Sequence, residues 1–418
     1  MSATTGARSR VASHAGITFA GLMLANVLGY AFYALVSRSL GVESYGTFSS
    51  LVAIVLILSA PALIGQMVVA KLAADFALDE LRLSGLVAAV DRVTIVVALA
   101  GGSAFAALSV PIAYFLHIGD PLLVTFAGLA LCGAVALPFL RGVLQGTASF
   151  RGYALSNVAE NLSKAVLAPV LGLFYGLRGA MLGLALGYAC AAAFTFVAAS
   201  ARRVAGALPF SLRSVVRTSA AVALAVVCLN VLLLYDVVLA KRYLDAHTAG
   251  LYGAAALASR ALYAVVAFVP TVLLPQAAGQ AARGERTRYL FAQAFGVTAL
   301  LCTAACVLFA FAPRFVIVVI AGRAFAGGAP LLPAYVIAVA ALAAANVVAT
   351  YNIARSRLGF VAPLALVAAG EIIAVVVRHR TAADLLQTIV VGHLLALVAC
   401  ATALGGRGKP PERAKGAP

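Results

Sequence analysis

The sequence predicts an all-α, polytopic membrane protein with about twelve transmembrane helices. Of its 418 residues, 64% are hydrophobic and only 10% are charged, which leaves too little polar surface for a soluble protein of this length. The apolar residues also gather in segments of about 20 residues, the length that an α-helix needs to cross a bilayer. The expected fold is therefore a bundle of membrane-spanning helices.

A short polar joint between two apolar segments occurs once in each half of the chain. Residues 37–46 form the first joint and residues 241–253 form the second. In both, a basic residue ends one segment, and a Tyr-Gly pair, Tyr45-Gly46 or Tyr252-Gly253, opens the next. This recurrence predicts one helical bundle built twice.

Twelve apolar segments satisfy the length rule, and we expect one membrane span in each. They are 14–37, 47–70, 93–116, 121–144, 153–175, 177–200, 216–240, 250–276, 289–312, 331–354, 358–377 and 385–404. Six spans fall in a predicted N-terminal lobe, 1–208, and six in a C-terminal lobe, 209–404. The polar, Pro-rich residues 405–418 are expected to form a flexible tail. Residues 71–92, where charges alternate with leucines, are expected to form an amphipathic surface helix joined to the third span.

The distribution of Lys and Arg predicts the orientation. Most of these residues lie in segments on one side, such as 71–92, 141–151 and 202–217, whereas the other side holds few, among them Arg38 and Lys241. Because Lys and Arg collect in cytoplasmic loops, we expect both termini in the cytoplasm. The bias also accounts for the net charge of +17 without nucleic acid as a partner.

A charge at membrane depth costs about 2.5–3.5 kcal/mol, so each one needs a partner or a wet cavity. Arg260 lies near the middle of the eighth predicted span, with no acid within a helical turn or two. It is expected to line a cavity or contact a ligand; the alternative is an ion pair with Asp236 or Glu371 on another helix. Asp236 and Glu371 are themselves candidates, with interhelical hydrogen bonding as their alternative.

Polar residues follow one face of two further spans. On the fifth span, Asn157, Glu160, Asn161 and Lys164 are spaced i, i+3, i+4 and i+7, which favours a cavity lining over a simple Glu160–Lys164 pair. On the first span, Asn26 and Tyr30 begin a similar stripe that also includes Tyr33 and Ser37 and ends beside Arg38. Because lipid-facing surfaces are apolar, this stripe is expected to face a cavity or a neighbouring helix.

Motifs typical of enzymes are lacking. The sequence has no GxxxxGK[ST] phosphate loop, no HExxH, no GxSxG and no acidic metal cluster, and its inter-span loops are short. The six cysteines lie inside apolar segments without metal-site spacing, so we interpret them as packing residues. We expect neither a cofactor nor catalysis.

The first joint, Arg38-Ser39-Leu40-Gly41 followed by Tyr45-Gly46, resembles the R-x-L-G-x-x-x-(Y/F)-G signature of polysaccharide biosynthesis flippases. These belong to the multidrug/oligosaccharidyl-lipid/polysaccharide (MOP) exporter superfamily. Leu137-Pro138, Arg141-Gly142 and Gln145-Gly146 at the end of the fourth span extend the resemblance.

The resemblance implies two six-helix lobes around a central cavity in the cell inner membrane, opening alternately to either side. It implies as substrate an oligosaccharide on a polyprenyl pyrophosphate, from exopolysaccharide, capsule or O-antigen synthesis, and as partners a polysaccharide polymerase and glycosyltransferases. Family members carry cations on the cavity wall, a role that Arg260 and Lys164 match. The first span lacks the arginines of lipid II flippases, which favours the other saccharides.

Two other functions stay open. A cation-coupled exporter of small cationic drugs would need an acid in its cavity, for which Glu160, Asp236 and Glu371 are candidates. A membrane-embedded polysaccharide polymerase or ligase is the third hypothesis, against which the short outer loops argue. Without an ATP-binding motif, a transporter of this sequence would draw on an ion gradient, the membrane potential or removal of product.

Overall fold

The computed structural model describes residues 2–201, 203–204, 220–282 and 287–404, and within them every regular element is a helix. The α-helices are α1 (Ser2–Leu40), α2 (Val42–Asp75), α3 (Glu80–Ala107), α4 (Ser109–Phe115), α5 (Pro121–Gly146), α6 (Phe150–Ser200), α8 (Ala220–Tyr243), α9 (Ala246–Val266), α10 (Phe268–Ala282), α11 (Arg288–Phe311), α12 (Pro313–Ile320), α13 (Leu332–Ala354), α14 (Val361–Val377) and α15 (Ala382–Ala401). A 3-10 helix, η2 (Arg323–Leu331), leads into α13.

The described helices match the twelve predicted spans. Ten are long and apolar enough to cross a membrane. One of these, α6, has 51 residues and a non-helical residue, Gly176, where two spans were predicted to meet. The shorter apolar helix α14 supplies the remaining span. The prediction of an all-α, polytopic fold is confirmed.

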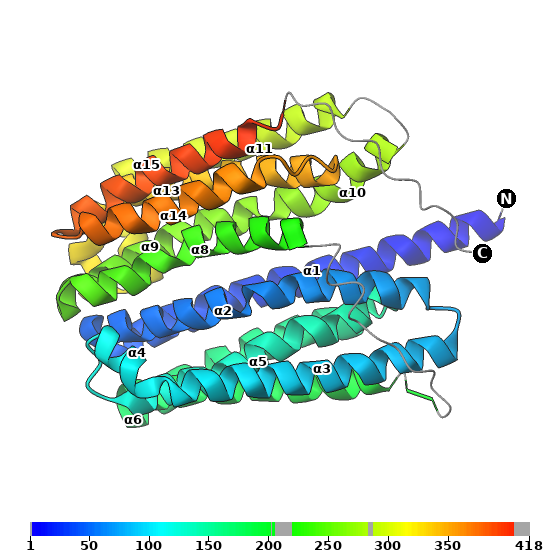
Figure 1. The fold of residues 1–418 in the computed structure, drawn as a ribbon, viewed down its shortest axis with the longest axis horizontal. Coiled ribbons are helices and arrows are strands. Elements are labelled where there is room, and N and C mark those ends of the chain that lie inside the picture. Colours follow the sequence, from blue (N-terminus) through cyan, green and yellow to red (C-terminus); the bar gives the residue numbers. More distant parts are fainter. Residues whose placement is uncertain (1, 202, 205–219, 283–286, 405–418) are drawn as a thin grey trace. The chain divides into compact units, whose positions relative to one another are not determined.

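The chain divides into two compact units, the first containing α1–α6 and the second α8–α15. Within each unit the long helices run side by side (Figure 1). Four features lie outside the described residues: the predicted lobe boundary and linker within 205–219, Arg202, the pair Arg283 and Arg286, and the tail 405–418. The lobe limits, the cavity between lobes and the cytoplasmic orientation stay predictions.

The surface helix predicted over residues 71–92 is wrong. Residues up to Asp75 complete α2, and Glu80 already begins α3, which continues without a break through the third span. Leu86, Val87 and Val90 are fully buried, in a core that α2 and α5 also form. Most of the charges therefore lie on exposed sides of packed helices, whereas Asp91 is buried and forms an ion pair with Arg203.

In the first unit, α6 is a helical hairpin that turns at Gly176. Its backbone there has φ 56° and ψ −141°, a conformation that essentially only glycine adopts. The two arms approach closely: a Cβ on Gly183 would lie 2.5 Å from the backbone of Leu167 and Ala168. Small residues allow such contact where no hydrophobic force drives helices together, and α1 and α5 pack against this hairpin.

The two predicted joints are sharp turns between helices. Gly41, with φ 72°, is the single residue between α1 and α2, which explains the glycine after Leu40 in the middle of the joint. Between α8 and α9, the Asp245 carboxylate accepts a hydrogen bond from the Thr248 amide at 3.0 Å and caps α9. Tyr45 and Tyr252, the tyrosines of the two Tyr-Gly pairs, are both buried.

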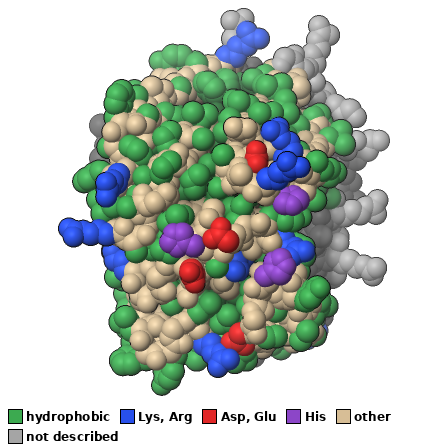
Figure 2. Space-filling model, turned by 90° about the vertical axis from the view of Figure 1, so that its left-hand side faces the viewer, with side chains coloured by type: hydrophobic (Ala, Val, Ile, Leu, Met, Phe, Trp, Pro, Cys, Tyr) green, Lys and Arg blue, Asp and Glu red, His purple; other side chains and the backbone are tan. Residues whose placement is uncertain are grey.

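In the second unit, α13 is the central helix and packs against α9, α10, α11 and α15, while α14 packs on α15. The buried face of α13 includes Tyr335, Leu342 and Tyr351. Figure 2, which looks at ends of helices, shows Lys and Arg, Asp and Glu, and His side chains among hydrophobic ones. Charges are expected there, because helix ends leave the hydrocarbon region.

Candidate functional site

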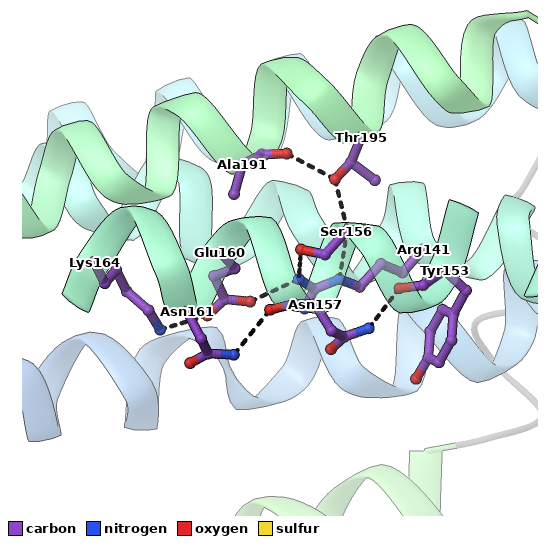
Figure 3. Close-up of polar contacts among 9 residues, drawn as sticks. All are labelled: Arg141, Tyr153, Ser156, Asn157, Glu160, Asn161, Lys164, Ala191 and Thr195. Carbon is purple, nitrogen blue, oxygen red and sulfur yellow. Dashed lines mark hydrogen bonds and ion pairs between the residues drawn. The ribbon is translucent and has the colours of Figure 1, made fainter. Parts of the chain in front are cut away.

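The first unit contains a buried cluster of two cations around one carboxylate. Glu160 accepts from Arg141 Nη2 at 2.7 Å through Oε2 and from Lys164 Nζ at 2.6 Å through Oε1 (Figure 3). Arg141 comes from α5, whereas Glu160 and Lys164 lie one turn apart on the first arm of α6. Arg141 and Lys164 are 8% and 7% exposed, so water screens these charges little.

Arg141 is held in place by buried hydroxyl groups. Its Nε donates to Ser156 Oγ and its Nη2 to the Ser156 carbonyl, both at 2.9 Å. Ser156 Oγ in turn hydrogen-bonds Thr195 Oγ1 on the second arm of α6, at 2.6 Å (Figure 3). The guanidinium is therefore fixed by contacts that also join the two arms.

Lys164 lies among aromatic rings and packs against a glycine. Its Nζ is 4.6 Å from the centroid of Tyr188 and 5.7 Å from that of Phe32, distances at which a ring face attracts a cation. A Cβ on Gly187 would lie 2.8 Å from Lys164 Cγ, so the glycine makes room for the lysine.

The two asparagines of the predicted stripe satisfy their own helix. Asn157 donates to the Tyr153 carbonyl at 2.8 Å, and Asn161 donates to the Asn157 carbonyl at 3.0 Å (Figure 3). Both side chains are half-buried on the face that carries Glu160 and Lys164. The side-chain oxygen of Asn161 lies beside Gly29 of α1.

The sequence reasoning missed Arg141, which it assigned to an inner loop on the basis of its charge. Arg141 lies within the predicted fourth span, 121–144, at a depth where a cation needs a partner. That position was the available signal. With Arg141 included, the described cluster has two positive charges and one negative charge, a surplus of one cation.

The second unit contains a cluster centred on Asp236 of α8, which is 2% exposed. Arg260 of α9 donates to Asp236 Oδ1 at 2.6 Å. Tyr252 and Tyr335 donate to the other oxygen, Tyr252 at 3.2 Å. Arg260 therefore has the Asp236 partner that was its predicted alternative, although its side chain keeps 17% of its surface exposed.

Glu371 and His393 lie next to this cluster. Glu371 Oε1 accepts from Tyr235 at 2.8 Å and lies 3.5 Å from His393 Nε2, whereas its Oε2 is buried without a hydrogen-bond partner among the described residues. The two ring nitrogens of His393 face the carbonyls of Ala338 and Leu232, at 2.9 and 3.1 Å. Because carbonyls only accept, both contacts are satisfied only when both nitrogens carry protons.

Charge counting separates the two clusters. If Glu371 is ionised and His393 is neutral, the described groups Arg260, Asp236 and Glu371 have a surplus of one negative charge, and a proton on either Glu371 or His393 would balance it. Glu371 also lines a groove of about 880 Å³ between α13, α14 and α15, whose other lining residues are mostly apolar but include Arg378. The second cluster thus suits a cation, and the first suits an anion.

The remaining predicted residues lie on α1. Asn26 and Arg38 are exposed within their unit and Tyr30 is half-buried. Arg38 donates to the Ala34 carbonyl of its own helix at 2.8 Å. The α1 side chain that contacts Lys164 is Phe32. In the described part of the chain, no group of three or more His, Cys, Asp or Glu side chains could hold a metal ion.

Solved structures resemble this chain over nearly its whole length, although no protein-family model and no curated protein matches its sequence. An inward-facing multidrug resistance MATE family transporter of the MOP superfamily has a TM-score of 0.75 and 13% identity, covering 90% of this chain and 92% of its own. The lipid II flippase MurJ, inward closed, has a TM-score of 0.71 and 11% identity, covering 93% and 87%. The chain has the fold of MOP superfamily transporters.

A MOP superfamily transporter from Pyrococcus furiosus, described as having a binding pocket of reverse polarity, gives a TM-score of 0.54 at 15% identity over 92% and 91% of the two chains. At such identities the similarity concerns the fold. The fold that the resemblance implied is therefore confirmed, and proteins with this fold include a drug transporter and a lipid flippase.

Proposed function

We propose that the protein is a transporter, not an enzyme, and that it moves a polyprenyl-pyrophosphate-linked oligosaccharide across the cell inner membrane by alternating access. The oligosaccharide is a repeat unit of exopolysaccharide, capsule or O-antigen. The surplus cation of the Arg141–Glu160–Lys164 cluster supports this proposal most. A buried excess of positive charge is costly unless an anion approaches it, and a pyrophosphate is such an anion.

Lys164 is the residue best suited to contact the pyrophosphate. Its ammonium has three N–H donors, and Glu160 accepts from it, so donors remain for phosphate oxygens. Arg141 has its Nε and Nη2 committed to Ser156 and Glu160 and therefore positions Glu160 beside the lysine. When the substrate binds, its negative charge replaces part of the attraction that Glu160 supplies.

The other candidate residues have secondary roles in this proposal. Arg260 stays a proposed anion contact of its own unit, with its charge shared with Asp236, and Glu371 belongs to the same second-unit network. Hydrogen bonds to the saccharide come from Asn157, Asn161, Asn26, Tyr30 and Arg38.

Glycosyltransferases would make the substrate, and a polysaccharide polymerase would use the product. Movement of one net charge through a membrane potential is worth about 2.3 kcal/mol per 100 mV, a source of energy that needs no ATP site.

A second candidate function is cation-coupled export of small organic cations. The excess negative charge of Asp236 and Glu371 over Arg260 favours it, as does the groove that Glu371 lines. The groove of about 880 Å³ is mostly apolar and has the size of a site for an amphiphilic molecule, with Glu371 and Arg378 as the charged residues of its wall. The similarity to a multidrug resistance MATE transporter agrees with this alternative.

Binding measurements on the purified full chain distinguish the two functions. We expect a polyprenyl pyrophosphate to bind, and Lys164→Met to weaken its binding about tenfold, equivalent to about 1.4 kcal/mol. Lys71→Met, which removes an exposed cation from α2 of the same unit, is the matched control and should leave binding unchanged. Binding of a rhodamine-type cation with no binding of the pyrophosphate would contradict the proposal and favour the alternative.

A further inference from the structure

Three arginines that neither proposed function uses gather at one end of the second unit. Arg288 begins α11, Arg355 follows the last residue of α13, and Arg357 lies in the turn before α14. Figure 1 shows the start of α11 and the ends of α13 and α15 at the same end of the second unit. Side-chain hydrogen bonds join these segments.

Arg355 is fixed by a buried tyrosine. Its Nη1 donates to Tyr351 Oη at 3.1 Å, and its guanidinium lies 5.3 Å from the centre of that ring. The Tyr351 hydroxyl also hydrogen-bonds Thr287 Oγ1 at 2.8 Å, and both side chains are buried, at 2% and 3% exposure. This contact brings Arg288, the next residue, to the end of α13.

Arg357 is anchored to the end of α15. Its Nη1 donates to the carbonyls of Leu404, at 2.7 Å, and Ala403, at 3.4 Å, while its Nε is buried with no hydrogen-bond partner among the described residues. Burial of the guanidinium lowers the pKa of Arg357, and the positive charges of Arg355 and Arg288 lower it further. The three guanidinium groups therefore repel one another.

The described part of the chain offers these arginines no carboxylate. None of them forms an ion pair among its residues. Glu285 and Glu412 lie in segments outside the described residues, and each segment carries more basic than acidic residues: Arg283 and Arg286 beside Glu285, and Arg407, Lys409, Arg413 and Lys415 around Glu412. Both segments therefore carry a net positive charge, and the described residues supply the three arginines with no compensating anion.

We propose that Arg288, Arg355 and Arg357 form a binding site for the phosphate of an anionic phospholipid headgroup. Headgroup phosphates lie where membrane-spanning helices end, and the cytoplasmic leaflet, which the sequence assigns to this end, is the anionic one. Guanidinium groups bind phosphate through paired N–H donors, and several of them share one phosphate well. A bound phosphate would remove the repulsion and link the ends of α11, α13 and α15.

If the site is specific, the stability of the protein should depend on anionic lipid through Arg355 and Arg357. A general attraction between basic loops and anionic membranes would involve other arginines equally. The full-length protein in nanodiscs of phosphatidylcholine alone, or of phosphatidylcholine mixed with phosphatidylglycerol, is heated while its unfolding is followed, and native mass spectrometry counts retained lipids. We expect phosphatidylglycerol to raise the unfolding temperature of the wild type and to remain bound. Arg355→Gln and Arg357→Gln should each abolish the rise and weaken lipid retention about tenfold, about 1.4 kcal/mol.

Control variants make the result specific. Arg378→Gln and Arg380→Gln, in the turn between α14 and α15, should keep the full response, because the headgroup contacts they lose lie at the opposite end of the helices. Equal responses of all arginine variants would overturn the proposal. Stabilisation by inorganic phosphate to the same extent as by phosphatidylglycerol would overturn the assignment to a lipid.

Discussion

At the scale of single residues, the balance of buried charges differs between the two clusters and gives each its chemistry. In the first unit, Glu160 alone compensates Arg141 and Lys164. In the second, Asp236 accepts hydrogen bonds from Arg260 and from two tyrosine hydroxyls. Glu371 accepts one from Tyr235 and lies 3.5 Å from His393. A charge in such surroundings is stable only with a partner, so removing a partner costs more than the attraction itself.

Glu160→Gln should therefore destabilise the protein. The change leaves two cations without a carboxylate at a site where both are buried, and we expect a loss of about 3–5 kcal/mol of unfolding free energy, the usual cost of breaking a buried pair. Thermal unfolding in detergent measures it, with the exposed Glu43 of α2 as the comparison through Glu43→Gln. An unchanged unfolding temperature for Glu160→Gln would mean that the cluster is hydrated and only weakly coupled.

Sequence reasoning found the partners that share a helix and missed those that do not. The Glu160–Lys164 contact follows from i, i+4 spacing, and Asp236 was named as one of two possible partners of Arg260. Arg141 is 19 positions before Glu160 and on another helix, so no local periodicity connects them. The role of His393 depends on two carbonyls, of Ala338 and Leu232, that only the folded backbone brings together.

At the scale of helices, span lengths were readable and helix packing was not. The break at residue 176 was placed correctly because each arm of α6 is about one bilayer thickness long. The surface helix over 71–92 was wrong because alternating charges describe one side of a helix only. Whether Leu86 and Val90 on its other side face lipid headgroups or the α5 helix is decided by tertiary packing.

Gly176→Ala tests the hairpin of α6. An alanine at φ 56° and ψ −141° is strained by about 1–3 kcal/mol, and we expect the unfolding temperature in detergent to fall accordingly. Gly296→Ala is a suitable control, since Gly296 lies within α11 and a Cβ there meets no atom within 4 Å. That change should be neutral or slightly stabilising, because alanine favours helix. Equal effects of the two changes would contradict the backbone assignment at Gly176.

At the scale of the whole molecule, the chain repeats one plan with different chemistry. Each unit has a sharp turn followed by a buried Tyr-Gly tyrosine, Tyr45 or Tyr252, and each buries an ion cluster among its helices. Tyr252 also binds the acid of its own cluster. The MOP fold was predictable because apolar span length, a repeated joint and the joint signature all pointed to it. The substrate was not, because the same fold serves drug transporters and a lipid flippase.

Transbilayer movement of the substrate tests the account most directly. The purified protein is placed in liposomes together with a fluorescent polyprenyl-pyrophosphate oligosaccharide, and a membrane-impermeant quencher reports how much label reaches the other leaflet. We predict faster movement with the wild type than in protein-free liposomes, a loss of that gain with Lys164→Met, and its retention with Lys71→Met. Movement no faster than in protein-free liposomes, under an imposed membrane potential of either sign, would contradict the account.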